Sequence, residues 1–310
     1  MLYLFLAIIL GSLFAVLFKI CQKKNIDTAQ VILFNYVTAV VFSSAAILFK
    51  VWGGKADFAT YALDAKSILL AVLQGAFFYA GFFIMNRSTW RSGVALTTAA
   101  ARASLVIPLI LSWLIFSQSE PSWLLVGMIL VAMLLMVLPA QSEKHDSKYQ
   151  TGISEKTRRR KTMLALVAVF VIYGLSDFLL KVVQNSVQTS AGLDSQKVYI
   201  FLSATVVSLV ACIASGSFKN DGKRNRSSLH QGFRMRNLIG GIILGLINAG
   251  CTSCMLLALG HISTSTFYPL YNIGIVVLAT LVGVLFFKEK LKLLQVAGLV
   301  LAAAAIALSL

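Results

Sequence analysis

The fold is decided by an apolar stretch at the start of the chain, residues 2–20, which reads LYLFLAIILGSLFAVLFKI. A helix needs about 20 mostly apolar residues, at 1.5 Å of rise each, to cross a bilayer. The stretch therefore predicts a membrane-spanning helix. No basic residue precedes it and no clear small-residue cleavage site follows it, so we expect a first span and not a removable signal peptide.

Further stretches of similar length and polarity continue along the chain. They lie at residues 29–49, 67–86, 93–116, 121–138, 162–183, 198–216, 238–259, 263–287 and 293–310. The 310 residues are 58% hydrophobic and 12% charged, which is more apolar than a soluble domain of this length can bury. We therefore expect an all-α integral membrane protein with about ten transmembrane helices. Residues 50–66, which include Trp52 and Phe58, are expected to lie along the membrane interface as a short amphipathic segment.

The charge of the chain is strongly positive, with 27 Lys and Arg against 11 Asp and Glu, a formal net charge of +16. In a soluble protein this would indicate nucleic acid as a partner. Here the basic residues gather in short connections between apolar stretches, so we expect a lipid bilayer and no nucleic acid. The connections after the fifth, seventh and ninth predicted spans are the basic ones. The positive-inside rule then predicts that these lie in the cytoplasm and that both termini lie outside.

The two halves of the chain resemble each other weakly. Matching residues recur in the same order in both halves: Lys19 with Lys181, Gly75 with Gly245, and Gly127 with Gly298. This predicts a first five-helix repeat over 1–138, a basic cytoplasmic linker over 139–161, and a second repeat over 162–310. Because five crossings are an odd number, the second repeat enters the membrane inverted. Such inverted repeats are typical of alternating-access carriers with a site near the midplane.

The chain resembles the drug/metabolite transporter superfamily, in particular its ten-helix EamA-type members. The resemblance covers essentially the whole chain and rests on the lysine near the end of the first span of each half, Lys19 and Lys181. It rests also on the turn Phe287-Lys288-Glu289-Lys290-Leu291 ahead of Gly298. It implies a multi-pass protein of the bacterial cytoplasmic (inner) membrane.

One departure from the relatives limits what the resemblance implies. The small four-helix multidrug relatives carry a membrane glutamate two turns before that lysine, where it exchanges protons for cationic drugs. Gly11 and Tyr173 stand at these positions here. The resemblance therefore implies metabolite transport more than proton-coupled drug antiport through that residue.

Charged side chains within predicted spans are candidate functional residues, because burying each costs about 2.5 to 3.5 kcal/mol on insertion scales. Arg102 is expected either to line a cavity and attract an anionic or carboxylate-bearing substrate, or to pair within the bundle near Pro108. Asp177 and Lys181 lie one helical turn apart, so their side chains share a face. They are expected to form a neutralising pair, or Asp177 serves as a proton or cation coupling site.

Polar side chains within the spans are candidates for a substrate cavity. Pro269 frees a carbonyl in the preceding turn, and a broken or kinked helix at mid-depth is where transporter sites are often built. The candidates are Tyr268, Tyr271, Asn272, Asn248, Tyr79, Gln74, Tyr36 and Asn35. Each of them, taken singly, also fits interhelical packing. Gly241 and Gly245 form a G-x-x-x-G spacing, which predicts close approach of two helices.

No set of catalytic residues emerges from the sequence. The three histidines lie in or beside connections without metal-ligand spacing, and there is no phosphate-binding glycine loop. We expect no enzyme activity, cofactor or metal. The leading hypothesis is a secondary transporter that moves a small-molecule substrate, an amino acid or related organic solute, by alternating access. The alternatives are a lipid or lipid-linked sugar translocator, which the resembling superfamily also contains, and a membrane scaffold that does not transport.

Overall fold

The described part of the chain is built from helices. The computed structural model describes residues 1–23, 27–54, 56–92, 94–116, 122–137, 155–187, 189–215, 235–287 and 293–309. Across these ranges the regular elements are α-helices and one short 3₁₀ helix, with no strand. The predicted all-α membrane fold is confirmed.

Each predicted span coincides with helical structure. Seven helical stretches of the described ranges are long and apolar enough to cross a membrane, and three shorter apolar helices accompany them. The helices are α1 (Leu2–Lys23), α2 (Thr28–Trp52), α3 (Ala65–Ser92), α4 (Val94–Ala103), α5 (Val106–Phe116), α6 (Trp123–Val137), α7 (Glu155–Ser186), α8 (Ser190–Ser215), α9 (Met235–His261), α10 (Thr264–Phe287) and α11 (Leu293–Ser309).

The span predicted at 93–116 is not one helix, because it breaks between α4 and α5 at Ser104 and Leu105. Pro108 explains the break: it has no N–H to donate, and its ring clashes with the carbonyl four residues earlier, which is that of Ser104. The backbone N–H of Ile107 donates instead to that carbonyl, at 2.9 Å. Pro269 behaves differently, since it lies inside an unbroken α10. The broken helix therefore carries Arg102, not the candidates around Pro269.

Two of the predicted connections contain helical residues. The region predicted as linker, 139–161, is already helical from Glu155, where α7 begins, while 139–154 lies outside the described residues. In the described part of residues 50–66, α2 runs on to Trp52, and a single 3₁₀ turn, η1 (Phe58–Tyr61), follows. The interfacial position of this segment stays a prediction. The basic connections 216–234 and 288–292 lie outside the described residues.

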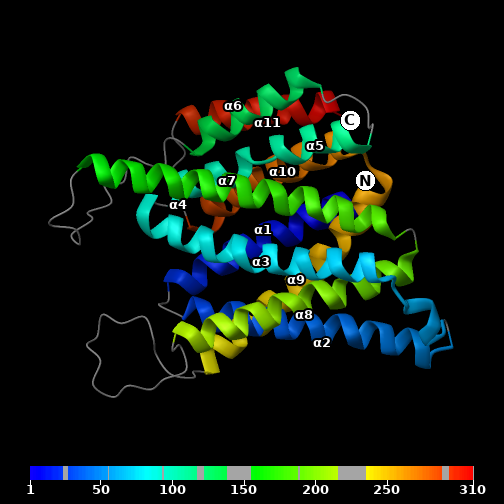
Figure 1. Cartoon of the computed structure of the whole chain (residues 1–310). Helices are drawn as coiled ribbons and strands as arrows, with labels where there is room; N and C mark the ends of the chain where they lie inside the picture. The colour runs from blue at the N-terminus through cyan, green and yellow to red at the C-terminus, as the bar shows by residue number, and fades with distance from the viewer. Residues whose placement is uncertain are drawn as a thin grey trace, which may run out of the picture. The chain divides into compact units, whose positions relative to one another are not determined.

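The helices divide into two compact units, and each unit takes helices from both predicted halves of the chain. Unit 1 comprises Met1–Tyr79 and Val182–Gly260, and unit 2 comprises Ala80–Lys181 and His261–Leu310. In unit 1, α2 packs along α8, and η1 contacts α8 (Figure 1). These units are groups in space and not the two predicted repeats, which follow one another along the chain and stay a prediction.

Close approach of helices in unit 1 depends on glycines. A Cβ added to Gly241 on α9 would lie 2.3 Å from Cβ of Phe34 on α2, and one added to Gly245 would lie 2.5 Å from the carbonyl oxygen of Asn35. Both distances are shorter than atoms tolerate. The predicted packing role of this G-x-x-x-G spacing is confirmed, because only glycine allows the two backbones to come this near.

The outer face of α8 shows why unit 1 suits a bilayer. Its buried stripe, at four-residue spacing, is Ala204, Ser208 and Cys212. On the other side of the same helix, Val206, Val210 and Ile213 are exposed, with 53%, 61% and 65% of their surface accessible. An apolar exposed face costs free energy in water and none in hydrocarbon, so this face is one that lipid tails cover.

In unit 2, α6 packs along α11, and α10 contacts α5, α6 and α11 (Figure 1). Helix α7 comes close to α5 at Gly174, where an added Cβ would lie 2.5 Å from Cδ1 of Ile107. Tyr173, which precedes that glycine, packs its ring against Gly81 of α3: a Cβ added to Gly81 would lie 3.5 Å from Cε2 of Tyr173. Unit 2 therefore holds α7, α4–α5 and α10 in one packed group, and this group positions the candidate site.

Candidate functional site

Arg102 lies in the last turn of α4, directly before the helix break, and its side chain is half-buried. Its Nη1 donates a hydrogen bond to Oδ1 of Asn272 on α10, at 3.0 Å. A guanidinium carries five N–H donors, so one neutral amide does not use up its capacity for an anion. The arrangement pairs two residues that the sequence named as substrate-binding candidates.

Asn272 is held in a fixed orientation by hydrogen bonds from both ends of its amide. The oxygen accepts from Arg102, and Nδ2 donates to the backbone carbonyl of Tyr268, at 3.0 Å. Tyr268 in turn donates from its hydroxyl to the backbone carbonyl of Asp177 on α7. We call Arg102, Asp177, Tyr268 and Asn272 the Arg102 cluster. It links α4, α7 and α10 within unit 2.

The charge of Arg102 acts on α7 as well as on α10. It attracts the carboxylate of Asp177 and lies within electrostatic reach of Tyr173, one turn before Asp177 on the same helix. The hydroxyl of Tyr173 donates to Sδ of Met85, at 2.9 Å. Lys181, the partner that the sequence suggested for Asp177, is buried on α7 with 5% of its surface exposed. An Asp177–Lys181 pair stays a prediction. Arg102, on α4, is a second cation that acts on the Asp177 carboxylate.

Aromatic rings support the α10 side of the cluster. The ring of Phe267 stacks on that of Tyr271, with centroids 5.5 Å apart and planes 11° apart. The same ring meets Tyr268 edge-on at 5.1 Å. Phe267 and Tyr268 are completely buried, and Tyr271 is 9% exposed. Tyr268 and Tyr271 thus both pack against Phe267 on α10, and a role for them in substrate binding stays a prediction.

The remaining predicted candidates, Asn248, Asn35, Tyr36, Gln74 and Tyr79, belong to unit 1. Nδ2 of Asn248 on α9 donates to Oδ1 of Asn35 on α2, at 3.3 Å. Tyr36 and Gln74 are both fully buried, and Tyr79 is half-buried at the end of the unit. The interhelical role weighed for Asn35 and Asn248 has direct support in this hydrogen bond. One α9 face carries Asn248 together with the close-packing glycines.

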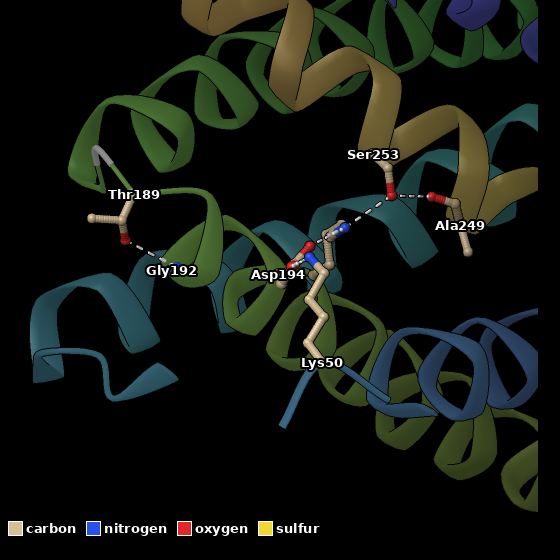
Figure 2. A network of polar contacts seen from close by, with 7 residues as sticks. Lys50, Thr189, Gly192, Asp194, Ala249 and Ser253 are labelled. Atoms are coloured by element: carbon tan, nitrogen blue, oxygen red, sulfur yellow. Dashed lines mark hydrogen bonds and ion pairs between the residues drawn. The ribbon is translucent and has the colours of Figure 1, made fainter. Parts of the chain in front are cut away.

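A charged network that the sequence analysis did not identify lies in unit 1. Asp194 of α8 pairs with Lys50 of α2 and with Lys197 of α8, and Lys197 also donates to Oγ of Ser253 on α9, at 3.0 Å (Figure 2). The predicted spans ended before Lys50 and began after Lys197, so these residues were assigned to connections. The three-residue spacing of Asp194 and Lys197, which fits one helix face, was the signal for a longer α8.

Metal-ligating residues do not gather in the part of the chain that the structure describes, where no group of three His, Cys, Asp or Glu could hold an ion. Cys251 and Cys254 lie in α9, and Sγ of Cys251 contacts the backbone carbonyl of Ala7 on α1. Cys251 therefore takes part in the packing of α9 against α1.

Comparison with known proteins relates the chain to membrane transport. The Small Multidrug Resistance protein family matches residues 226–302, a range that includes α9, α10 and the α10 residues of the Arg102 cluster. The match and the apolar helices indicate a multi-pass membrane transporter. This agrees with the predicted transport role, and a transporter-like family match favours a role other than catalysis.

Two further comparisons cover nearly the whole chain. The chain is 28% identical over 307 residues to an uncharacterised protein of Haemophilus influenzae (strain ATCC 51907 / DSM 11121 / KW20 / Rd), covering 98% of this chain and 95% of that protein. A solved crystal structure, described only as that of a protein, aligns with 99% of this chain and 95% of its own at a TM-score of 0.69 and 13% identity. This structure has the same fold.

Proposed function

We propose that the chain is a secondary transporter that moves a small metabolite, an amino acid or a related organic solute, by alternating access. One observation carries the proposal: Arg102 lies at a helix break within a membrane span and is oriented by Asn272. Intramembrane charges are costly, and they mark substrate and ion pathways. Broken helices within a span are where transporters build their binding sites.

The substrate group that suits Arg102 is a carboxylate. A guanidinium binds a carboxylate with two parallel hydrogen bonds, which a lysine or an amide cannot reproduce. Asn272 offers an amide beside the guanidinium for a second polar group of the substrate. This combination favours a small soluble anion or zwitterion over a long apolar ligand.

The proposal includes the broader plan inferred from the sequence. Two inverted repeats of the ten-helix EamA type would relate the halves of the chain, and the setting would be a bacterial cytoplasmic membrane with both termini outside. Its support is the ten helical positions, the compact units that combine helices from both halves, and the family match in the second half.

A thermal-shift screen of the purified protein against amino acids and small organic acids is the first test. A ligand that binds only the folded state raises the free energy of unfolding by RT ln(1 + [L]/Kd), about 2.7 kcal/mol at a hundredfold excess over Kd. We expect a saturable shift with carboxylate-bearing compounds. A folded preparation that shifts with no soluble compound would contradict the metabolite hypothesis and favour a lipid-linked substrate.

The second test is uptake of the radiolabelled hit into proteoliposomes. Arg102→Gln is expected to weaken binding by about tenfold to a hundredfold, because hydrogen bonds to charged groups contribute about 1.5–3 kcal/mol. Arg87→Gln is the matched control, since Arg87 is an exposed arginine of the same unit. Equal uptake by both variants would refute the assignment of Arg102.

A further inference from the structure

An ion triplet with an excess positive charge joins α2 and α8 in unit 1. Nζ of Lys50 lies 2.5 Å from Oδ2 of Asp194, and Nζ of Lys197 lies 2.7 Å from Oδ1 of the same carboxylate. Two lysines share one aspartate, so the triplet carries a net charge of +1. Each oxygen of the Asp194 carboxylate already contacts one lysine. Within the triplet, one of the two positive charges is therefore not neutralised.

The extra charge is presented outward at Lys50. The side chain of Lys50 is 46% exposed, against 13% for Asp194 and 14% for Lys197. Lys197 is further fixed by its hydrogen bond to Ser253, whose hydroxyl donates to the carbonyl of Ala249, at 2.8 Å (Figure 2). An anion from outside the protein therefore meets Lys50 first.

The residues around Lys50 suit a bilayer interface. Its neighbours Phe49 and Trp52 at the end of α2 are 77% and 82% exposed. Tryptophan is enriched at the headgroup level of membrane proteins because its ring is amphipathic, so Trp52 suits that level. The exposed lysine and the exposed rings thus stand together at one end of a membrane-spanning helix.

Apolar surface leads away from Lys50 along both helices that carry the triplet. On α2, Val41 and Phe42 are 62% and 48% exposed, and on α8, which packs along α2, Val206 and Val210 are 53% and 61% exposed. A molecule with an anionic headgroup and apolar tails fits this arrangement, in which an exposed lysine is followed along the helices by exposed apolar side chains.

We propose that Lys50 binds the anionic headgroup of a phospholipid whose acyl chains lie on the exposed apolar faces of α2 and α8. The inference is independent of the transport proposal, because the triplet belongs to unit 1 and the Arg102 cluster to unit 2. The positive charge of the triplet selects anionic over zwitterionic lipid, and Asp194 sets the strength of that charge.

The test is native mass spectrometry of the purified protein in equal amounts of phosphatidylglycerol and phosphatidylethanolamine. The wild type is expected to retain phosphatidylglycerol preferentially. Lys50→Gln is expected to lower this preference about fivefold, the effect of one basic residue at an anionic surface. Lys66→Gln is the matched control, because Lys66 is an exposed lysine at the start of α3 in the same unit.

Asp194→Asn separates ligand binding from a merely structural role. Removing the carboxylate raises the charge of the triplet from +1 to +2, so the preference for phosphatidylglycerol should increase. A lower preference in Asp194→Asn, or equal preferences in Lys50→Gln and Lys66→Gln, would overturn the proposal. So would displacement of the lipid by glycerol phosphate at equal concentration, because that result would assign a soluble phosphate site.

Discussion

The guanidinium of Arg102 on α4 donates to Oδ1 of Asn272 on α10, at 3.0 Å, and so joins two helices that lie far apart in the chain. The hydrogen bond forms where α4 ends, directly before the break that Pro108 imposes. Substrate binding at Arg102 would act on the same contact, because both need the guanidinium. The Arg102–Asn272 hydrogen bond therefore contributes to the packing of α4 against α10.

A double-mutant cycle measures this contact. Arg102→Gln and Asn272→Leu should each lower the unfolding free energy in detergent, and the double variant should lose less than the sum of the two. Interhelical hydrogen bonds in membrane proteins give coupling energies that average about 0.6 kcal/mol and reach about 1.7 kcal/mol. Strictly additive losses would show that the two side chains do not interact.

Tyr268 should stabilise the fold without contacting the substrate. Its ring is completely buried, and its hydroxyl donates to the backbone carbonyl of Asp177. Tyr268→Phe removes this hydrogen bond and is expected to lower the unfolding free energy by about 0.5–1.5 kcal/mol. Ligand affinity, read from the thermal-shift titration, should stay within twofold of the wild type, a margin of about 0.4 kcal/mol. A large loss of affinity at unchanged stability would instead place the hydroxyl in the binding site.

The fold could be predicted from the sequence because bilayer thickness fixes span length. Each predicted span coincides with helical structure, although the span at 93–116 is divided into α4 and α5, and the glycine spacing of α9 correctly predicted close packing. The break at Ser104 was not predicted, although Pro108 was in view, because a proline can equally remain inside a continuous helix, as Pro269 does in α10. Which of the two occurs depends on tertiary packing.

The candidate site could be predicted only in part. Arg102, Tyr268 and Asn272 were named because they are polar within apolar spans, and the structure brings them together with Asp177. Asn35 and Asn248 gave the same signal, yet they pair with each other in unit 1. A sequence shows that a polar group lies within a span and not which helix it faces, so its partner had to come from the structure.

Gly245 should tolerate no side chain, because an added Cβ would lie 2.5 Å from the carbonyl oxygen of Asn35 and 2.6 Å from Cβ of Thr38. Gly245→Ala forces α9 away from α2 and is expected to cost about 1–3 kcal/mol of unfolding free energy, the usual cost of overpacking. Gly127 on α6 is the matched control, since an added Cβ there meets nothing within 4 Å. Gly127→Ala should be neutral or stabilise by up to about 1 kcal/mol, because alanine favours helix. Thermal unfolding of both variants decides, and equal effects would show that α2 and α9 are not closely packed.

Asp177 is expected to couple transport to protons, a prediction that depends on the proposed function. Asp177 is half-buried within a span, and Arg102 attracts its carboxylate. A substrate carboxylate bound to Arg102 would weaken that attraction, so the negative charge of Asp177 would become more costly in a low-dielectric site. The protonated form of Asp177 is then favoured, so one proton would enter with each substrate anion.

Uptake into proteoliposomes under an imposed pH gradient tests this coupling. Asp177→Asn should abolish accumulation driven by the gradient and keep the exchange of labelled for unlabelled substrate, since exchange needs no net proton movement. Asp57→Asn, a change at an exposed aspartate before η1, should leave both processes unaltered. Gradient-driven accumulation that persists in Asp177→Asn would exclude proton coupling through this carboxylate. A wild-type protein that exchanges no labelled substrate would count against the transport function itself. The two failures are therefore distinguishable in a single preparation.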